Sequence, residues 1–212
     1  LLKDVEDLKN NNMKVAHEVP FAMLEDSLEF NDYQYILPHL LENEKYLNFM
    51  LEYRKQNNSF IIMDNGLFEG VNHTEKELIK SINLINPDVF ITPDTWNDAD
   101  LTWDNYLKWK NKVDSEKIMV VIQANDMFEA EDLHDKLIDD GVKYIGFNHL
   151  AQFYDDFSTH PHFDSRKTLG RVEFITYMQT IGRLSKNVHY HLLGCNLATE
   201  FKFYPNVYFP EI

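Results

Sequence analysis

The stretch FIIMDNGLFE, residues 60–69, decides the fold because it joins a buried strand to a polar turn. The four residues FIIM are typical of a strand that is buried on both faces. Asn65-Gly66 then predicts a tight turn. Asp64 is therefore expected at the carboxyl end of a strand, which is where parallel α/β proteins carry their chemistry. The alternative interpretation is that Asp64-Asn65-Gly66 only closes a turn.

The same alternation of strand and helix continues along the chain. Strands are expected at residues 60–63, 89–92, 118–122, 143–147 and 188–193. Helices are expected at 74–85, 99–112, 127–140 and 169–185. Strands that alternate with helices imply a parallel sheet covered by helices. The segment 150–167, which is rich in Asp, His and Ser, is expected to be an irregular loop.

The two ends of the chain add further candidates. Residues 14–17 are a candidate first strand, and 24–57 are expected to be mostly helical with a break at Pro38. A short amphipathic helix at 1–12, a helix near 197–202 and a strand at 207–209 complete the pattern. About seven strands predict a single α/β domain over residues 1–212. It is either a compact or incomplete TIM-like barrel, for which ~250 residues are typical, or an open doubly wound sheet.

Composition narrows the class of protein. The chain has 212 residues, a formal net charge of -15 and a single cysteine, which excludes a disulfide framework and a multi-cysteine zinc site. No apolar run approaches the ~20 residues of a membrane span, so a cytoplasmic protein without membrane contact is expected. The acidic charge argues against a broad nucleic-acid-binding surface. A local basic patch remains possible, and its candidates are Arg166, Lys167 and Arg171.

Polar residues follow most of the predicted strands, and in a parallel barrel these strand ends converge on one face. They are Asp64, Asp94, Gln123 and Asn148, and the last of these strands ends in Gly194. Two carboxylates and two amides suit a flat heterocycle that offers both donors and acceptors, and Phe68 is placed to stack on its ring. The spacing does not match a metal site or a nucleophile–histidine pair. The alternative is that each polar residue only caps a helix or closes a turn.

Four segments, in order over roughly residues 60–201, resemble the tRNA-guanine transglycosylase superfamily. DNGLFE at 64–69 is similar to its motif DSGGFQ, and PDVFITPD at 87–94 resembles its second acidic strand. VIQA at 121–124 resembles VQG, and LGCNLATEF at 193–201 resembles MGVGTPEDL. The wording of DNGLFE and of HLLG at 191–194 is closest to the DNA-directed branch. Those enzymes occur in phages and bacterial modification islands and exchange guanine in DNA for a 7-deazaguanine such as 7-cyano-7-deazaguanine.

The resemblance implies a (β/α)8 barrel that exchanges a base at a glycosidic bond, without a cofactor. Asp64 matches the acid that serves as general base and contacts the incoming base. The remaining matches are residues that read the base edge (Asp94, Gln123), the neighbour of the stacking site (Phe68), the pocket floor (Leu193, Gly194) and a backbone contact (Gly146). The expected partners are DNA, with tRNA as the alternative, and a 7-deazaguanine base; in a phage the protein would work in the host cytoplasm.

Two departures from the family pattern leave alternatives open. The family's nucleophilic aspartate is expected at or beyond Ile212, and no Asp occurs in 205–212. The three cysteines and histidine of the zinc subdomain of the tRNA enzymes are absent, which favours the DNA branch. The rival hypotheses are a tRNA-directed enzyme, and a non-catalytic barrel that binds a deazaguanine or nucleic acid as a homodimer or accessory subunit. The last rival hypothesis is an unrelated barrel lyase or hydrolase that uses Asp64 and Asp94 as an acid/base pair.

Overall fold

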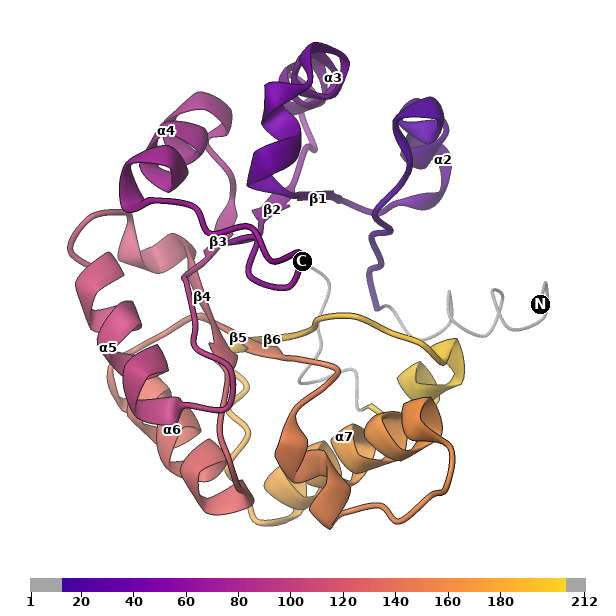
Figure 1. The fold of residues 1–212 in the computed structure, drawn as a ribbon, viewed down its shortest axis with the longest axis vertical. Coiled ribbons are helices and arrows are strands. Elements are labelled where there is room, and N and C mark those ends of the chain that lie inside the picture. Colours follow the sequence, from indigo (N-terminus) through magenta and orange to yellow (C-terminus); the bar gives the residue numbers. More distant parts are fainter. Residues whose placement is uncertain (1–12, 205–212) are drawn as a thin grey trace.

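A computed structural model describes residues 13–204 and shows six parallel strands that curl into a half-barrel with helices on the outside (Figure 1). The strand order follows the chain. The strands are β1 (Gln34–Ile36), β2 (Ile61–Met63), β3 (Val89–Ile91), β4 (Ile118–Ile122), β5 (Tyr144–Phe147) and β6 (His189–Leu192). The predicted α/β class is confirmed, and the arrangement is consistent with a partial TIM-like barrel.

The helices follow the strands in the expected alternation. They are α2 (Ser27–Phe30), α3 (Glu44–Arg54), α4 (Glu75–Ile85), α5 (Ala99–Trp109), α6 (Met127–Asp139) and α7 (Phe163–Thr180). Short 3-10 helices occur at η1 (Phe21–Met23), η2 (Pro38–Glu42), η3 (Ser115–Lys117), η4 (Gln152–Asp156) and η5 (Ala198–Phe203). None of the helices between residues 13 and 204 combines the length and apolar character that crossing a bilayer requires.

Local sequence explains where the helices begin and end. Helix α4 opens with a capping box in which the Thr74 side chain accepts from Glu77 N and the Glu77 carboxylate accepts from Thr74 N. Helix α4 stops because Asn86 adopts a left-handed conformation, with φ of 51°. At the start of α6, Asp126 accepts from the backbone N–H groups of Phe128 and Glu129.

The sheet is buried on both faces, and its residues alternate between two cores. On the concave side, Ile62, Ile91 and Val121 pack together inside the curl. On the convex side, Met63 and Phe90 pack against the helices. This period of two is what strand geometry requires. Because both faces are apolar, polar side chains of the central strands are confined to the loops at the strand ends.

The first strand of the sheet differs from the prediction. Residues 14–17 are extended but lie outside the sheet, and β1 instead forms at residues 34–36, within the stretch expected to be helical. The 13–19 segment is tied to the loop before β1, because Val15 N donates to Asp32 Oδ2 at 2.8 Å and His17 N donates to Asn31 Oδ1 at 2.8 Å. Pairing with β2 decides the strand, since a three-residue run carries too little local signal.

The predicted irregular loop at 150–167 is also partly wrong. It contains η4, and α7 begins at Phe163, six residues before the predicted start. Contacts between η4 and α7 explain the early start: Arg166 and Lys167 both pair with Asp155. Gly170 permits the close approach of these elements, because a Cβ there would clash with the Tyr154 carbonyl. The helix predicted at 1–12 and the strand predicted at 207–209 lie outside the described residues.

Candidate functional site

A cavity of about 300 Å³ opens where the carboxyl ends of the strands converge. Its lining comes from the ends of β1 through β6 and from the segment before β1. Seven of the residues predicted for the site line it: Asp64, Phe68, Asp94, Gln123, Asn148, Leu193 and Gly194. The strand-end arrangement expected from a parallel sheet therefore brings these distant residues together.

A row of hydrogen-bonded side chains crosses this cavity from β2 to β5. Asn65 Nδ2 donates to Asp94 Oδ1 at 2.9 Å, and Gln123 Nε2 donates to Asp94 Oδ2 at 2.5 Å. Asn148 Nδ2 in turn donates to Gln123 Oε1 at 3.0 Å. Asn65 also donates to Thr92 O, which anchors the β2 end to the β3 end. We call these four side chains (Asn65, Asp94, Gln123 and Asn148) the amide row.

The carboxylate of Asp94 lies at the centre of the amide row and has neutral partners only. Burial raises the pKa of Asp94 to about 6, although the hydrogen bonds from Gln123 and Asn65 favour its ionised form. A carboxylate has about four lone-pair sites, of which the two amides use two. Asp94 therefore keeps acceptor capacity for a ligand inside the cavity.

Asp64 occupies the β2 side of the cavity and is almost completely buried. Its Oδ1 accepts from Asn65 N at 2.6 Å, and its carboxylate also accepts the hydroxyl hydrogen of Tyr35. Burial raises the pKa of Asp64, these hydrogen bonds oppose the shift, and the nearby Glu69 carboxylate adds to it. Asp64 is thus a carboxylate whose proton affinity is increased, as a general base requires.

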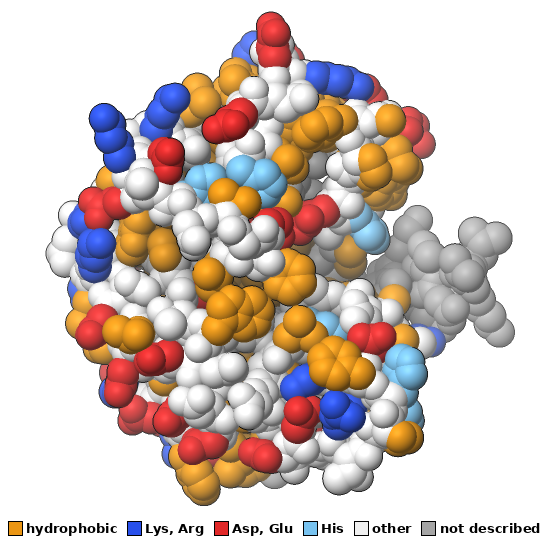
Figure 2. All heavy atoms as spheres, viewed as in Figure 1, with side chains coloured by type: hydrophobic (Ala, Val, Ile, Leu, Met, Phe, Trp, Pro, Cys, Tyr) orange, Lys and Arg blue, Asp and Glu red, His pale blue; other side chains and the backbone are white. Residues whose placement is uncertain are grey.

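Two aromatic side chains form the rim of the cavity. Phe68 is 68% exposed and Trp96 is 41% exposed, and their ring centroids lie 6.3 Å apart with the planes tilted by 43°. Large exposed aromatics beside a polar cavity are suited to stacking on a flat ligand. On the face shown in Figure 2, hydrophobic side chains gather near the centre with acidic side chains beside them, and most Lys and Arg lie nearer the edge.

The two predicted glycine contacts have different positions. Gly194 lines the cavity with φ of +67°, and a Cβ there would lie 3.2 Å from His149 Cβ. Gly146 lies within β5 and is not part of the cavity lining. A Cβ at Gly146 would lie 2.5 Å from Leu193 Cδ1, so Gly146 makes room for the leucine that forms the floor. Gly146 therefore shapes the floor of the cavity from below, whereas the predicted role was a backbone contact with the base.

The predicted basic patch is corrected by burial. Arg171 is fully buried, forms an ion pair with Glu200 and donates to the carbonyl oxygens of Phe147, Leu193 and Gly194. Lys167 is also buried and donates to Ala151 O at 3.1 Å. Both cations serve the fold, because each is enclosed by its partners. A phosphate contact is therefore not available to either of them.

Arg166 is the remaining member of the predicted basic patch. Its side chain is 28% exposed and pairs with Asp155 at 3.0 Å. It therefore keeps part of its guanidinium at the surface, where a weak pair with a carboxylate can be exchanged for a contact with phosphate. Its predicted contact with nucleic acid stays a prediction.

Sequence reasoning missed several residues of the cavity. The polar ones are Glu18, Tyr35, Asn65, Glu69, His149 and Asn196, and Trp96 is a further aromatic one. Asn65 and Glu69 belong to the opening motif, and His149 follows Asn148 directly, so their proximity to the site was visible in the sequence. Glu18 and Tyr35 carried no such signal, because their positions depend on β1, which the sequence pattern does not reveal.

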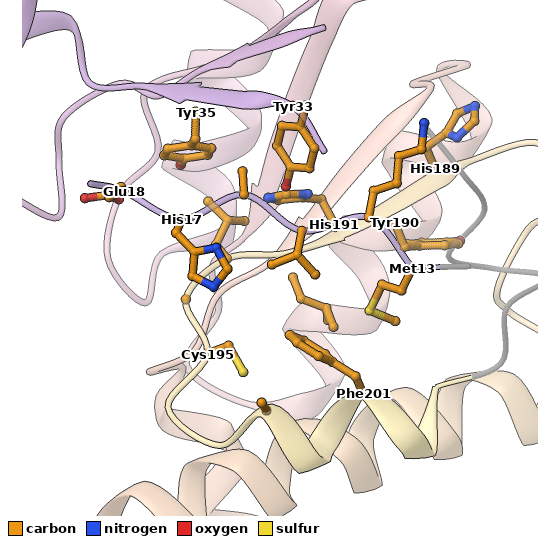
Figure 3. Close-up of a pocket in the computed structure, with 17 residues that line it drawn as sticks. Met13, His17, Glu18, Tyr33, Tyr35, His189, Tyr190, His191, Cys195 and Phe201 are labelled. Carbon is orange, nitrogen blue, oxygen red and sulfur yellow. The ribbon is translucent and has the colours of Figure 1, made fainter. Parts of the chain in front are cut away.

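A second cavity, of about 340 Å³, adjoins the first between the 13–18 segment, β1 and β6 (Figure 3). The two cavities share Glu18, Tyr35, Leu193 and Gly194. Partial burial, followed by repulsion from Glu69 and Asp64, raises the pKa of Glu18. His191 lies between Tyr33 and Tyr35, with centroids 6.2 Å and 6.3 Å away, and burial lowers its pKa to about 4. It is therefore a neutral, packed residue of this second cavity.

No protein-family model matches the chain, and no curated protein matches it either. Within residues 13–204, no group of three or more His, Cys, Asp or Glu side chains is arranged to hold a metal ion. The arrangement that remains is a small cavity with the carboxylates of Asp64 and Asp94, four amides and an aromatic rim. These groups can hold a flat, polar heterocycle by its edge and accept a proton from it.

Proposed function

We propose that the cavity binds a guanine-like base and that the protein exchanges guanine in DNA for a 7-deazaguanine. The observation that carries this proposal is the amide row, which holds the Asp94 carboxylate beside the second buried carboxylate, Asp64. A volume of about 300 Å³ is at the lower end for ligand sites, which suits a single heterocycle. The four segments that resemble guanine transglycosylases contribute all of these residues except Asn148.

The geometry supports a division of labour between the two carboxylates. Asp94 keeps free lone pairs and accepts from the exocyclic amino group of the base. Asp64, with its raised pKa, takes the proton that the incoming base loses. Displacement of a base at C1′ passes through an oxocarbenium-like state that a carboxylate nucleophile captures, as in retaining glycosidases. The resemblance locates that nucleophile at or beyond Ile212, outside the described residues.

The aromatic rim supports a base that enters from a nucleic acid. A base in a duplex must be flipped out before it can reach a cavity at the mouth of a barrel. Phe68 and Trp96 offer exposed rings along that path. We favour DNA over tRNA because the sequence has one cysteine and so lacks the zinc ligands of the tRNA enzymes.

The test is a base-exchange assay with purified protein, a DNA duplex and a tRNA as parallel substrates, and 7-cyano-7-deazaguanine as the incoming base. We expect modified deoxynucleosides by mass analysis of the digested DNA, and we expect Asp64→Asn to abolish them without loss of fold. Asp98→Asn, which changes a helix cap outside the cavity, is the control for a lost carboxylate. Exchange in tRNA alone would contradict the DNA assignment, and full activity of Asp64→Asn would remove Asp64 from the mechanism.

A second candidate function is binding without catalysis. It is favoured by the contacts of Asp64, whose carboxylate is already held by Tyr35 and by the backbone of Asn65. A carboxylate held in this way is suited to ligand recognition as well as to proton transfer. Calorimetric binding of the base without any exchange in DNA or tRNA would support this candidate.

A further inference from the structure

His149 has an unusual environment for a buried histidine. The residue is 8% exposed and lines the cavity, and neither of its ring nitrogens has a hydrogen-bond partner among the described residues. Burial lowers its pKa, and the nearby Arg171 cation lowers it further, so the imidazole is neutral near pH 7. A neutral imidazole offers one N–H donor and one acceptor nitrogen.

His134 shows what a histidine with a structural role looks like in the same fold. It is completely buried, yet its Nε2 lies 3.0 Å from the Tyr190 hydroxyl and its Nδ1 lies 3.3 Å from Asp135 Oδ1. A buried polar group without a partner destabilises the fold, so most are paired within the protein. His149 departs from this rule at the one place where a ligand is proposed to bind.

The neighbouring residue leaves a second group without a partner. Asn148 donates its amide hydrogens to Gln123 Oε1 and Ile122 O, but Asn148 Oδ1 is buried and has no donor among the described residues. The β5 end thus holds an acceptor next to an imidazole that can donate. A matching ligand edge has a donor next to an acceptor.

The contacts within the amide row explain why residues at the β5 end are the ones that recognise this edge of the ligand. Gln123 uses its oxygen on Asn148 and one amide hydrogen on Asp94. One Gln123 amide hydrogen stays available, and the carbonyl oxygen of a guanine-like base has two lone pairs, so it can accept from a second donor as well. Among the side chains that line the cavity, His149 carries an N–H that no described residue occupies.

We propose that His149 determines specificity by donating its imidazole N–H to the carbonyl oxygen of a purine lactam, while Asn148 Oδ1 accepts from the adjacent ring N–H. This inference rests on the proposed function, because it assumes that a guanine-like base occupies the cavity. It adds two contacts at the β5 end to the recognition assigned to Asp94 and Gln123. A base without the lactam loses both contacts at once.

The test is calorimetric titration of the full chain with guanine and with O6-methylguanine, which has neither the carbonyl oxygen nor the ring N–H. We expect the wild-type protein to bind guanine at least about tenfold more tightly. His149→Phe should reduce that preference several-fold, because only the Asn148 contact to the lactam remains. His149→Gln, whose carboxamide can donate, should restore part of it.

Thermal unfolding separates this role from packing. We expect His149→Phe to unfold at the wild-type temperature or higher, because it removes a buried group without a partner. The matched control His134→Phe should unfold at a lower temperature and keep the preference for guanine. If His149→Phe and His149→Gln both keep the wild-type preference, while Asp94→Asn weakens guanine binding, the inference is overturned and the proposed function stands. A wild-type protein that binds neither base overturns both.

Discussion

Two charged side chains near the carboxyl ends of the strands, Arg171 and Asp94, have very different partners. Arg171 is enclosed by Glu200 and by three backbone carbonyls, so its charge is balanced within the protein. Asp94 meets only the neutral amides of Asn65 and Gln123, and its pKa is raised to about 6. The contacts of Arg171 hold the β5 and β6 ends together, whereas those of Asp94 leave lone pairs that can accept hydrogen bonds from a ligand in the cavity.

This difference in partners separates the groups that stabilise the fold from the groups that can bind a ligand. An ion pair whose donors and acceptors are all used within the protein has no group left to bind a ligand, so its role is structural. Asp94 has neutral partners, and neighbouring groups such as His149 have none. The desolvation free energy of such groups is only partly compensated within the protein, and a ligand that bonds to them can compensate the rest. The following experiments test this contrast.

The largest effect is expected at the ion pair. Arg171→Met leaves Glu200 buried without its cation, and we expect a loss of about 3–5 kcal/mol in the free energy of unfolding, measured with urea. The double variant with Glu200→Met should recover much of that loss, because no buried charge remains. A single variant with wild-type stability would contradict the structural role of Arg171.

The next effect concerns Asp94 and pH. Its pKa is raised from 3.8 to about 6 on folding, so between these values the folded chain holds a proton that the unfolded chain has released. Stability should therefore fall as pH rises from about 4 to 6, by at most about 3 kcal/mol, and the pH dependence should be weaker in Asp94→Asn. Urea unfolding across this range measures it. Equal slopes for the two proteins would show that burial does not perturb Asp94.

A smaller effect is expected at the aromatic rim, where binding and stability should separate. Phe68→Ala and Trp96→Ala should each weaken base binding by about 1–3 kcal/mol in calorimetry, because base stacking is lost. Both side chains are exposed, so the free energy of unfolding should change by less than about 0.5 kcal/mol. Phe128→Ala, which removes a 72% exposed ring outside the cavity, is the control and should leave binding unchanged.

The smallest effect is expected at Arg166, the exposed counterpart of Arg171. Arg166→Ala breaks one exposed pair with Asp155 and should cost less than about 1 kcal/mol of stability. If Arg166 contacts a phosphate, the salt dependence of DNA affinity should lose about one unit of slope. Arg183→Ala, which removes a surface cation paired with Asp135, is the matched control. Identical slopes for both variants would argue against a nucleic-acid contact at Arg166.

Much of the fold could be predicted because the central strands are apolar on both faces. The strands expected at 60–63, 89–92, 118–122, 143–147 and 188–193 all occur within one or two residues of the predicted bounds. Strand β1 was missed, since Gln34–Ile36 is too short to show a period and becomes a strand only by pairing with β2. The early start of α7 was missed for a similar reason, because its first turn depends on Asp155.

The sequence by itself determined which polar residues end the strands, since a buried strand can place polar groups only where it stops. That was enough to bring Asp64, Asp94 and Gln123 to one cavity through the parallel order of the sheet. The tertiary structure, in contrast, settles which charged and polar side chains are paired within the protein and which can bind a ligand. Arg171 was sealed against Glu200 and His149 was left without a partner, because burial and pairing depend on contacts between segments far apart in the chain.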